Sequence, residues 1–335
     1  MNFDYSEEQQ LLADSVRRFL QKEYDRGGDA WAKFAELGII GLPLPADHGG
    51  FGGGAVDLLG VMEAFGEALV VEPVVSTLVA ARLLSGHPLL QDVAEGRLRL
   101  AFAHAEKGAR YRPDAVDARF SDGKLSGEKN AVVGAPSAGK IVVSARDGGK
   151  IGLFLVDAPA MKAYPTIDGM RAADLSFRNA KAEKLEGGLD EIEAALDFGA
   201  ALGCAEASGA MKFACDTTLE YLKTRKQFGV PIGTFQALQH RMVDMFISWE
   251  QARSMACLAC SKVDQAQAGE RKRSVSAAKI KIADAARHVS QEAVQLHGGM
   301  GMTEELKVSH AFRRLTVHAA EFGDADFHLE RFASL

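Results

Sequence analysis

Two stretches of the sequence decide the fold: Arg225-Lys226-Gln227-Phe228-Gly229-Val230-Pro231-Ile232-Gly233-Thr234-Phe235-Gln236 and Gln295-Leu296-His297-Gly298-Gly299-Met300-Gly301. Each ends a long run in which apolar side chains recur at helical spacing. Pro231 prevents the first helix from continuing, and the Gly298-Gly299 pair lets backbone amides approach an anion closely. Arg225 adds a permanently charged, forked guanidinium that suits a pyrophosphate. From the residues alone, the stretches are either plain helix ends or two parts of an anion-binding site.

Residues 187–335, which contain both stretches, are predicted to form a four-helix bundle. The charged run Glu270–Arg273 is interpreted as a solvated turn within it. The predicted helices cover about Glu191–Thr224, Phe235–Ala266, Arg273–Leu296 and Glu304–Phe322, and a short last helix reaches Leu335.

Residues 97–186 have a different sequence pattern, with short runs rich in β-branched residues in place of long helical ones. The clearest strands are Ile141–Ser144 and Ile151–Val156. Asp122-Gly123 and Asp147-Gly148-Gly149 lie between such runs and are typical of hairpin turns. We therefore expect a middle domain that is an antiparallel β barrel or sandwich.

Residues 1–96 are predicted to form an N-terminal helical domain. Ser6 and Gln9 have the spacing of a capping box at the start of the first helix. Further helices are expected at about Asp29–Leu37, Val56–Phe65, Val75–Leu84 and Leu89–Glu95. The fold class is thus α+β multidomain, with helical, β and helical domains in that order.

The composition narrows the class of protein. The 335 residues are 47% hydrophobic and 25% charged with a net charge of −6, which favours a soluble globular protein with no basic footprint for nucleic acid. No apolar run approaches the roughly 20 residues that span a bilayer. The acidic N-terminus does not resemble a signal peptide, and four cysteines do not indicate a disulfide scaffold. We expect a cytoplasmic protein.

Two nucleotide-binding patterns are rejected on their context. Gly50–Ala55 has the dinucleotide-binding spacing, but it does not follow a strand. Gly134–Lys140 has the P-loop spacing, but Ile141 stands where a Ser or Thr should bind magnesium, and a strand follows.

No metal site is predicted either. The four cysteines lie within helical patterns and are interpreted as buried apolar residues, and the three C-terminal histidines as surface or packing residues. These residues are Cys204, Cys215, Cys257, Cys260, His310, His318 and His328.

The segment order and both opening stretches resemble the acyl-CoA dehydrogenase family over nearly the whole chain. The specific matches are Arg-x-x-Phe-Gly-x-x-Ile-x-x-Phe-Gln, continuing to Asp244-Met245, and Gln-x-x-Gly-Gly-x-Gly from Gln295. The resemblance implies FAD, an acyl-CoA substrate, electron-transfer flavoprotein as electron acceptor, and a flavin site shared across subunits, commonly in a dimer of dimers. The implied FAD residues are Arg225, Gln227, Phe228, Phe235, Gln236, Gln295, Gly298 and Gly299.

The catalytic base that the family uses is not found in either of its usual places. The family's Glu-Gly-Thr turn falls on Phe322-Gly323-Asp324, so Phe322 stands at the base position. Glu321 and Asp324 are the neighbouring carboxylates. The second family position falls near Gly199, where no acid coincides.

The residues that hold the flavin ring in the family are also replaced. The matching regions are Ala103–Tyr111 and Glu128–Gly134, with Ala131 in place of a Trp and Val133 in place of a Thr. These departures resemble the smaller subunits of heteromeric dehydrogenases that act on steroid or dicarboxylic acyl-CoAs, in which a partner supplies the base. Two alternatives are a self-sufficient homo-oligomer with Glu321 or Asp324 as base, and a non-catalytic assembly or regulatory subunit.

Overall fold

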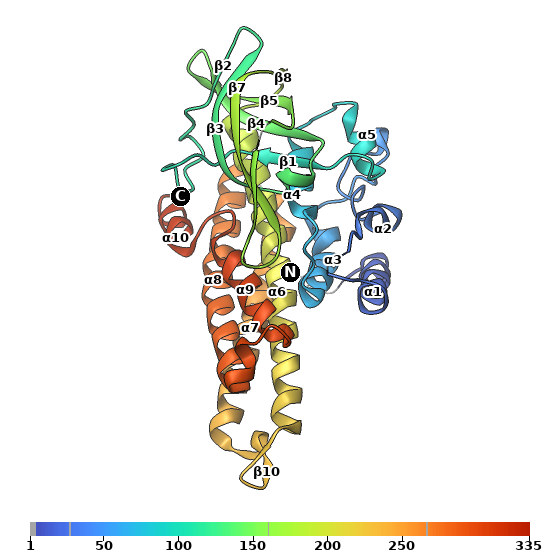
Figure 1. The fold of residues 1–335 in the computed structure, drawn as a ribbon, viewed down its shortest axis with the longest axis vertical. Coiled ribbons are helices and arrows are strands. Elements are labelled where there is room, and N and C mark those ends of the chain that lie inside the picture. The colour runs from blue at the N-terminus through green and yellow to red at the C-terminus, as the bar shows by residue number, and fades with distance from the viewer. Residues whose placement is uncertain (1–4, 27, 160, 266) are drawn as a thin grey trace. The chain divides into compact units, whose positions relative to one another are not determined.

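The computed structural model describes residues 5–26, 28–159, 161–265 and 267–335. The chain forms two compact units that each combine separate stretches of sequence (Figure 1). The helical unit contains Met1–Arg26, Ala55–Val70 and Ala200–Leu335, and the sheet unit contains Gly27–Gly54 and Val71–Gly199. The three-domain division at 96/97 and 186/187 stays a prediction, while the helical, β and helical order of the fold class is confirmed.

The sheet unit is built on one eight-stranded sheet with the order β6-β7-β3-β2-β4-β5-β8, and β1 pairs with β4. Ser121 pairs with Lys124, and Asp147 with Lys150, so both predicted hairpin turns are confirmed. The strands are β1 (Leu100–Ala103), β2 (Arg119–Ser121), β3 (Lys124–Val133), β4 (Lys140–Asp147), β5 (Lys150–Asp157), β6 (Met161–Pro165), β7 (Arg171–Lys181) and β8 (Glu183–Leu185).

The sequence predicted an antiparallel sheet, but the observed sheet also contains parallel pairs. β1 and β2 both run parallel to β4 and share one of its edges, with Leu100 opposite Lys140 and Arg119 opposite Arg146. Neither strand is joined to β4 by a tight turn, so the hairpin signals carried no information about this pairing. The core beneath is apolar and includes the fully buried Phe154.

Short helices complete the sheet unit. Its helices are α2 (Trp31–Glu36), η1 (Ala46–His48), α4 (Val74–Arg82), α5 (Leu89–Ala94) and η2 (Ala135–Ser137). The Gly134–Lys140 pattern contains η2 and enters β4, which agrees with its rejection as a P-loop.

The helical unit contains the long C-terminal helices, which run along one another (Figure 1). The capping box of Ser6 and Gln9 is present at the start of the first helix. The helices are α1 (Glu7–Lys22), α3 (Ala55–Ala68), α6 (Leu189–Thr224, which begins in the sheet unit), α7 (Gln236–Val263), α8 (Ala268–His297), η4 (Gly298–Met302), α9 (Lys307–Ala320) and α10 (Ala325–Ala333).

One helix boundary corrects the sequence prediction. Glu270–Arg273 is not a solvated turn, because α8 already begins at Ala268. The run remains helical because charged side chains suit an exposed helix face, and Glu270 forms an ion pair of 2.7 Å with Lys262 of α7. The predicted end of the preceding helix, at Ala266, lies outside the described residues. Within the described ranges, every helix is too short or too polar to traverse a bilayer.

Helices α3 and α6 cross with their backbones in direct contact. A Cβ atom at Gly66 would overlap the carbonyl oxygen of Glu206, and a Cβ atom at Gly209 would overlap that of Glu63. Glycine is therefore required on both helices by the close approach of the two backbones, rather than by a special backbone angle.

We predict that Gly66→Ala and Gly209→Ala each lower the free energy of unfolding by about 1–3 kcal/mol, because the added methyl group must force the helices apart. Gly269→Ala in α8 is the matched control, since nothing lies within 4 Å of a Cβ atom there. This control should be neutral or stabilising by up to about 1 kcal/mol. Urea denaturation measures all three variants, and a Gly66→Ala protein as stable as the parent would contradict the close crossing.

Candidate functional site

The first opening stretch forms a small hairpin at the end of α6. Strands β9 (Lys226–Gln227) and β10 (Val230–Pro231) pair antiparallel, and the turn between them has positive φ angles of 55° at Phe228 and 81° at Gly229. The amide of Ile232 donates to the carbonyl of Arg225 over 2.8 Å, which closes the hairpin. The 3-10 helix η3 (Ile232–Thr234) then leads into α7.

The second stretch lies at the same end of the bundle. The rings of Tyr221, near the end of α6, and His297, at the end of α8, stack with centroids 4.4 Å apart. The His297 ring also donates from Nδ1 to the carbonyl of Ala293 over 2.8 Å. Gly298 then turns the chain with a φ of 62°. The structure thus brings together the two stretches that are 70 residues apart in sequence, from Arg225 to Gln295.

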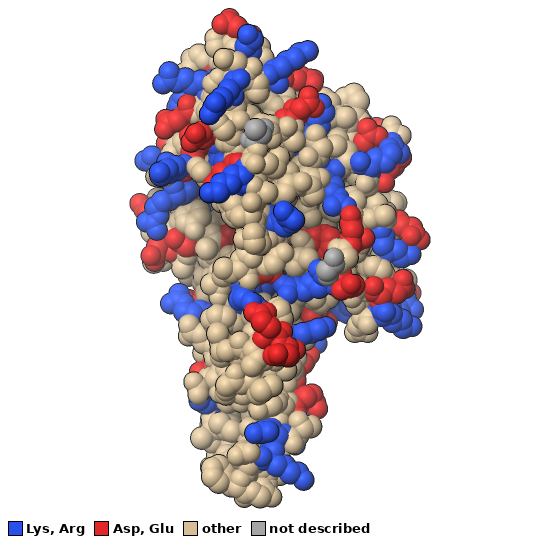
Figure 2. Space-filling view, viewed as in Figure 1, with Lys and Arg blue, Asp and Glu red and all other residues tan. Residues whose placement is uncertain are grey.

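All eight residues predicted to bind FAD are exposed at this end. Phe228 is 91% exposed and Phe235 39%, and their rings meet edge to face with centroids 6.1 Å apart. Nothing lies within 4 Å of a Cβ atom built at Gly298 or Gly299, so the backbone there is open to approach. In the face drawn in Figure 2, this end is mostly uncharged, with a small group of basic side chains near the β10 tip.

This donor set fits one end of FAD. The guanidinium of Arg225 and the open glycine amides suit a pyrophosphate, and exposed aromatic rings such as Phe228 suit an adenine. The exposure of large apolar rings also suits a surface that another chain covers. A metal is a poorer fit, because among the described residues no three His, Cys, Asp or Glu side chains gather to hold one.

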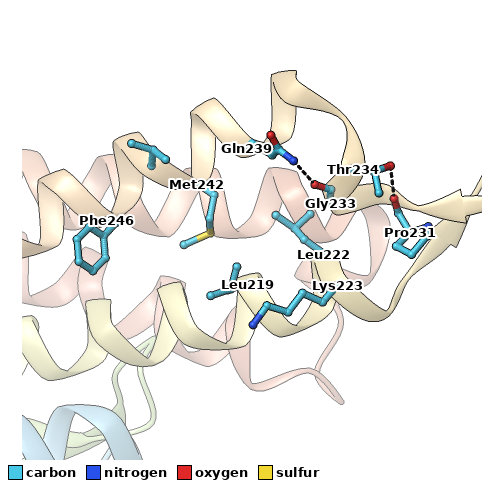
Figure 3. Close-up of a pocket in the computed structure, with 10 residues that line it drawn as sticks. Leu219, Leu222, Lys223, Pro231, Gly233, Thr234, Gln239, Met242 and Phe246 are labelled. Atoms are coloured by element: carbon cyan, nitrogen blue, oxygen red, sulfur yellow. Dashed lines mark hydrogen bonds between the residues drawn. The ribbon is translucent and has the colours of Figure 1, made fainter.

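An apolar pocket that the sequence analysis missed lies behind this hairpin (Figure 3). It has a volume of ≈ 590 Å³ and is formed by Leu219 and Leu222 of α6 with Met242 and Phe246 of α7. The side-chain amide of Gln239 in α7 donates to the carbonyl of Gly233 in η3 over 2.8 Å. The available signal was the spacing of Met242, Val243 and Phe246, which places three apolar side chains on one face of α7.

The turn at the family's base position is held by a side chain of α8, a side chain of α10 and the cap of α10. Lys279 of α8 donates to the carbonyl of Glu321 over 2.6 Å, and His328 Nε2 lies 3.1 Å from the carbonyl of Phe322. Asp324 accepts from the amide of Phe327 over 2.9 Å and caps α10. Phe322 itself has a φ of 58°, an unfavourable angle for a bulky residue. The turn is therefore fixed without any contribution from a carboxylate at 322.

Neither candidate base has the environment of a general base. Burial raises the pKa of Glu321, but the neighbouring His318 imidazole, whose Nδ1 lies 3.5 Å from the carboxylate, and the charge of Arg314 outweigh it, so the net pKa lies below its usual range. A general base needs a pKa moved towards neutrality, which is the opposite direction. Asp324 uses its carboxylate as the helix cap. Both residues stay predictions, and the structure gives each a structural role.

A buried polar cluster beside this turn was not predicted. Arg314 Nε and Nη2 donate to one carboxylate oxygen of Glu206 over 2.9 and 2.6 Å, and His318 Nε2 lies 3.5 Å from the same oxygen. Burial opposes ionisation of Glu206, but Arg314 and His318 outweigh it and hold its pKa below the usual range. Of the two roles predicted for these histidines, surface or packing, His318 and His328 have the packing role, since they are 2% and 0% exposed. The spacing of Arg314 and His318, four residues apart on one helix face, was the available signal.

The cysteines are buried, as the sequence predicted. Burial raises the pKa of the Cys204 and Cys257 thiols to about 11 and of Cys215 to about 12, so these residues are poor nucleophiles. Burial also raises the pKa of Cys260.

In the sheet unit, the regions that match the family's flavin-ring contacts bind one another. The Nζ atom of the fully buried Lys129 donates to Glu106 over 2.7 Å, to Ser144 over 3.0 Å and to the carbonyl of His104 over 3.0 Å. Burial lowers the pKa of Lys129 to about 8, against the opposing effect of Glu106. Ala131, where the family has a Trp, takes a left-handed φ of 52°. The polar side chains of these regions therefore find hydrogen-bond partners within the sheet unit.

We predict that Arg314→Met costs about 3–5 kcal/mol of unfolding free energy, because it leaves the buried Glu206 carboxylate unpaired. The matched control is Arg313→Met on the same helix, whose partner Glu304 is largely exposed, and this variant should lose far less. Chemical denaturation compares the two variants. Equal losses would contradict a special role for the buried pair.

The Glu206–Arg314 pair should also make the free energy of unfolding depend on pH in the acid range. Because the folded pKa of Glu206 is depressed, its contribution is fully present above the unfolded pKa of about 4.3 and is lost as the pH falls through the folded pKa. The Glu206→Gln variant should therefore show a flatter loss of stability below about pH 4 than the parent. Denaturation curves between neutral and acid pH measure this difference, and parallel curves would contradict it.

The family models and the relatives that match this chain belong to the same family. Residues 6–93 match the family model described as acyl-CoA dehydrogenase, N-terminal domain, and residues 186–334 match that described as acyl-CoA dehydrogenase, C-terminal domain. The acyl-CoA dehydrogenase FadE34 of Mycobacterium tuberculosis is 30% identical over 335 residues, which cover 96% of this chain. The chain spans 45% of the length of FadE34.

Two solved structures are similar over nearly their full length. A variant of the Tcur3481-Tcur3483 steroid ACAD is 27% identical with a TM-score of 0.88, covering 98% of this chain and 97% of that one. The ChsE4-ChsE5 complex from Mycobacterium tuberculosis is 25% identical with a TM-score of 0.89, covering 100% and 98%. The chain thus belongs to the acyl-CoA dehydrogenase family, whose members are FAD-dependent oxidoreductases that act on the CH–CH bond of acyl-CoA thioesters.

Proposed function

We propose that this chain binds the adenosine and pyrophosphate end of FAD and serves as one subunit of a hetero-oligomeric acyl-CoA dehydrogenase, whose partner supplies the catalytic base. The observation that carries the proposal is the turn at Phe322. It keeps a fixed geometry through Lys279 and His328, yet it presents a phenyl ring where the family has a carboxylate.

The exposed end of the bundle supports the cofactor role. Arg225 would neutralise the pyrophosphate, and the amides at Gly298-Gly299 would donate to it. Phe228 and Phe235 would cover the adenine, and Gln295 would add a polar contact. When bound, the flavin ring supplies the hydride acceptor for α,β-desaturation, with electron-transfer flavoprotein as the proposed final acceptor.

The similar structures support the subunit role. One is the ChsE4-ChsE5 complex, at 25% identity, and another is a steroid ACAD, at 27% identity. We therefore infer a bulky acyl group, such as a steroid side chain, as the substrate class. The self-contained Lys129–Glu106 pair in the sheet unit agrees with a chain whose flavin-ring contacts come from its partner.

We predict that the chain purified alone is colourless and inactive, whereas co-expression with a longer family member encoded nearby gives a yellow, active complex. Arg225→Gln should remove most bound flavin, since it deletes the charge that faces the pyrophosphate. Arg18→Gln, an exposed arginine on α1, is the matched control and should retain flavin. Visible absorbance and acyl-CoA turnover are the measurements.

The outcomes separate the alternatives. Full activity of the isolated chain would support the self-sufficient homo-oligomer, and a complex without flavin would support an assembly subunit. Either result would sink the proposal.

A second prediction concerns the base. In the active complex, Glu321→Gln and Asp324→Asn should each leave turnover within about twofold, because neither carboxylate is placed as a base, and an Asn also caps a helix. Phe322→Glu, which restores the family's carboxylate, is the informative third variant. Turnover with a saturating acyl-CoA measures all three, and a loss of about a hundredfold or more in Glu321→Gln or Asp324→Asn would identify that residue as the base.

A further inference from the structure

One aromatic contact joins the two stretches at the end of the bundle that is proposed to bind FAD. The ring of Tyr221 on α6 stacks on that of His297 on α8, with centroids 4.4 Å apart and an angle of 30° between the ring planes. The phenol of Tyr221 also donates to the carbonyl of His297 over 3.5 Å. This stack therefore ties the last turn of α6 to the last turn of α8.

Each member of the stack is connected directly to one of the two stretches. The carbonyl of Tyr221 accepts from the amide of Arg225 over 2.8 Å, so the start of the hairpin is bonded to the Tyr221 backbone. On the other side, His297 is the last residue of α8 and immediately precedes Gly298. A Cβ atom built at Gly301 would lie 3.1 Å from that of His297, so η4 folds back against the same residue. The spacing between Arg225 and the glycine turn thus depends on how the two rings pack.

The imidazole of His297 is buried with one nitrogen unpartnered. His297 is 3% exposed, and its Nδ1 donates to the carbonyl of Ala293 over 2.8 Å. Its Nε2 is buried and has no hydrogen-bond partner among the described residues. A neutral imidazole with its proton on Nδ1 fits this arrangement. A second proton on Nε2 would place a charged N–H in a buried position without an acceptor, which is strongly unfavourable.

The surroundings of the imidazole favour its neutral form. Burial lowers the pKa of His297 below its usual range, against the opposing effect of the hydrogen bond to Ala293, and among the described residues no charged side chain moves it. Tyr221, from α6, is a titratable side chain in contact with the ring, and a phenol is uncharged at neutral and acid pH. η4 contributes only glycines and methionines.

Acid should therefore act on the stack in one direction. When the stack opens, the imidazole of His297 meets water, where its pKa returns to about 6.5. Since the pKa is lower in the closed stack, the open form binds a proton more readily than the closed form. The closed stack is thus fully favoured above about pH 6.5 and is progressively lost as the pH falls below that value.

We propose that the Tyr221–His297 stack sets the spacing between Arg225 and the Gly298-Gly299 turn, and that protonation of the imidazole separates them. Tyr221 and His297 are then positioning residues, which act on the cofactor through their neighbours. This role rests on the proposed function, because a pyrophosphate held by the Arg225 guanidinium on one side and by the glycine turn on the other requires a fixed spacing. Flavin retention should accordingly fall in mildly acid solution.

Hydrogen exchange of the full chain tests the stack without flavin and without a partner. The reporters are peptides covering 225–232 and 298–303, which contain the hydrogen-bonded amides of Ile232 and Thr303. His297→Ala should speed exchange in both peptides by about two- to tenfold, which is the effect of losing one aromatic pair. Tyr221→Leu removes the other ring and should do the same. His297→Phe keeps a ring, loses no partner of Nε2, and should leave exchange unchanged.

The matched control for this experiment is His240→Ala, which removes an exposed imidazole from the first turns of α7, outside the stack. It should leave exchange in both peptides as in the parent, and thermal denaturation checks that every variant folds. Faster exchange in the 298–303 peptide alone would overturn the proposal, and so would equal acceleration in His297→Ala and His297→Phe.

Titration of the flavin-free complex with FAD tests the pH dependence, with flavin fluorescence as the readout. FAD is a suitable probe because its pyrophosphate keeps its charge from neutral to mildly acid pH. Lowering the pH from about 7.5 to about 5.5 should weaken FAD binding by up to about tenfold in the parent complex. The His297→Phe complex should lack this loss, because its ring takes up no proton. Equal weakening in the parent and in His297→Phe would overturn the proposed effect of protonation.

Arg225→Gln distinguishes a failure of this proposal from a failure of the proposed function. If the Arg225→Gln complex binds FAD as tightly as the parent, the proposed flavin site is wrong, and the exchange experiment still decides the role of the stack. If Arg225→Gln loses FAD while His297→Phe weakens in acid as the parent does, the flavin site stands and the proposed effect of protonation is wrong.

Discussion

The helical unit depends on one residue, Glu206, at the middle of α6. Its carbonyl oxygen lies against Gly66, which allows α3 to cross α6 in backbone contact. Its carboxylate binds Arg314 and so fixes α9 from the other side. A buried carboxylate is stable only when it is paired and hydrogen-bonded, so the position of α9 follows from that of α6. Glu206 therefore takes part in two contacts: its backbone in the close crossing of α3 and α6, and its side chain in the buried ion pair with Arg314.

Helix α9 connects Glu206 to the turn at Phe322. His318 lies one helical turn after Arg314, and the carbonyls of His318 and Glu321 both accept from Lys279 of α8. Lys279 is itself buried, and burial lowers its pKa against the attraction of neighbouring groups. The buried ion pair of Glu206 and Arg314 and the buried Lys279 are thus both connected to the end of α9, and in the Glu206–Arg314 pair each charge offsets the cost of desolvating the other.

The sequence predicted much of this architecture because its signals were local. Gly229, Pro231 and Gly298 mark helix ends whose positions depend on backbone angles at those residues, and the hairpin at Asp122-Gly123 is of the same kind. The parallel pairing of β1 and β2 with β4 was not predictable, since it joins strands without a tight turn. Glu206 was also missed, because a glutamate on a helix is ordinarily exposed, and its partner lies 108 residues away.

The contacts that hold the turn at Phe322 do not involve the side chain at the family's base position. A chain of this kind can therefore lack a carboxylate there and still form the turn. The backbone at 321–323 is held by Lys279 and His328, and Gly323 admits no side chain because His328 occupies that space. None of these contacts uses the side chain at 322, so replacing a carboxylate there with Phe322 removes a proton acceptor without removing what holds the turn. The same reasoning applies at the proposed flavin end, where the side chain of Arg225 is exposed. A subunit of this family can therefore keep its fold and its share of a cofactor site while the proton transfer is carried out by another chain, which is the division of roles that we propose.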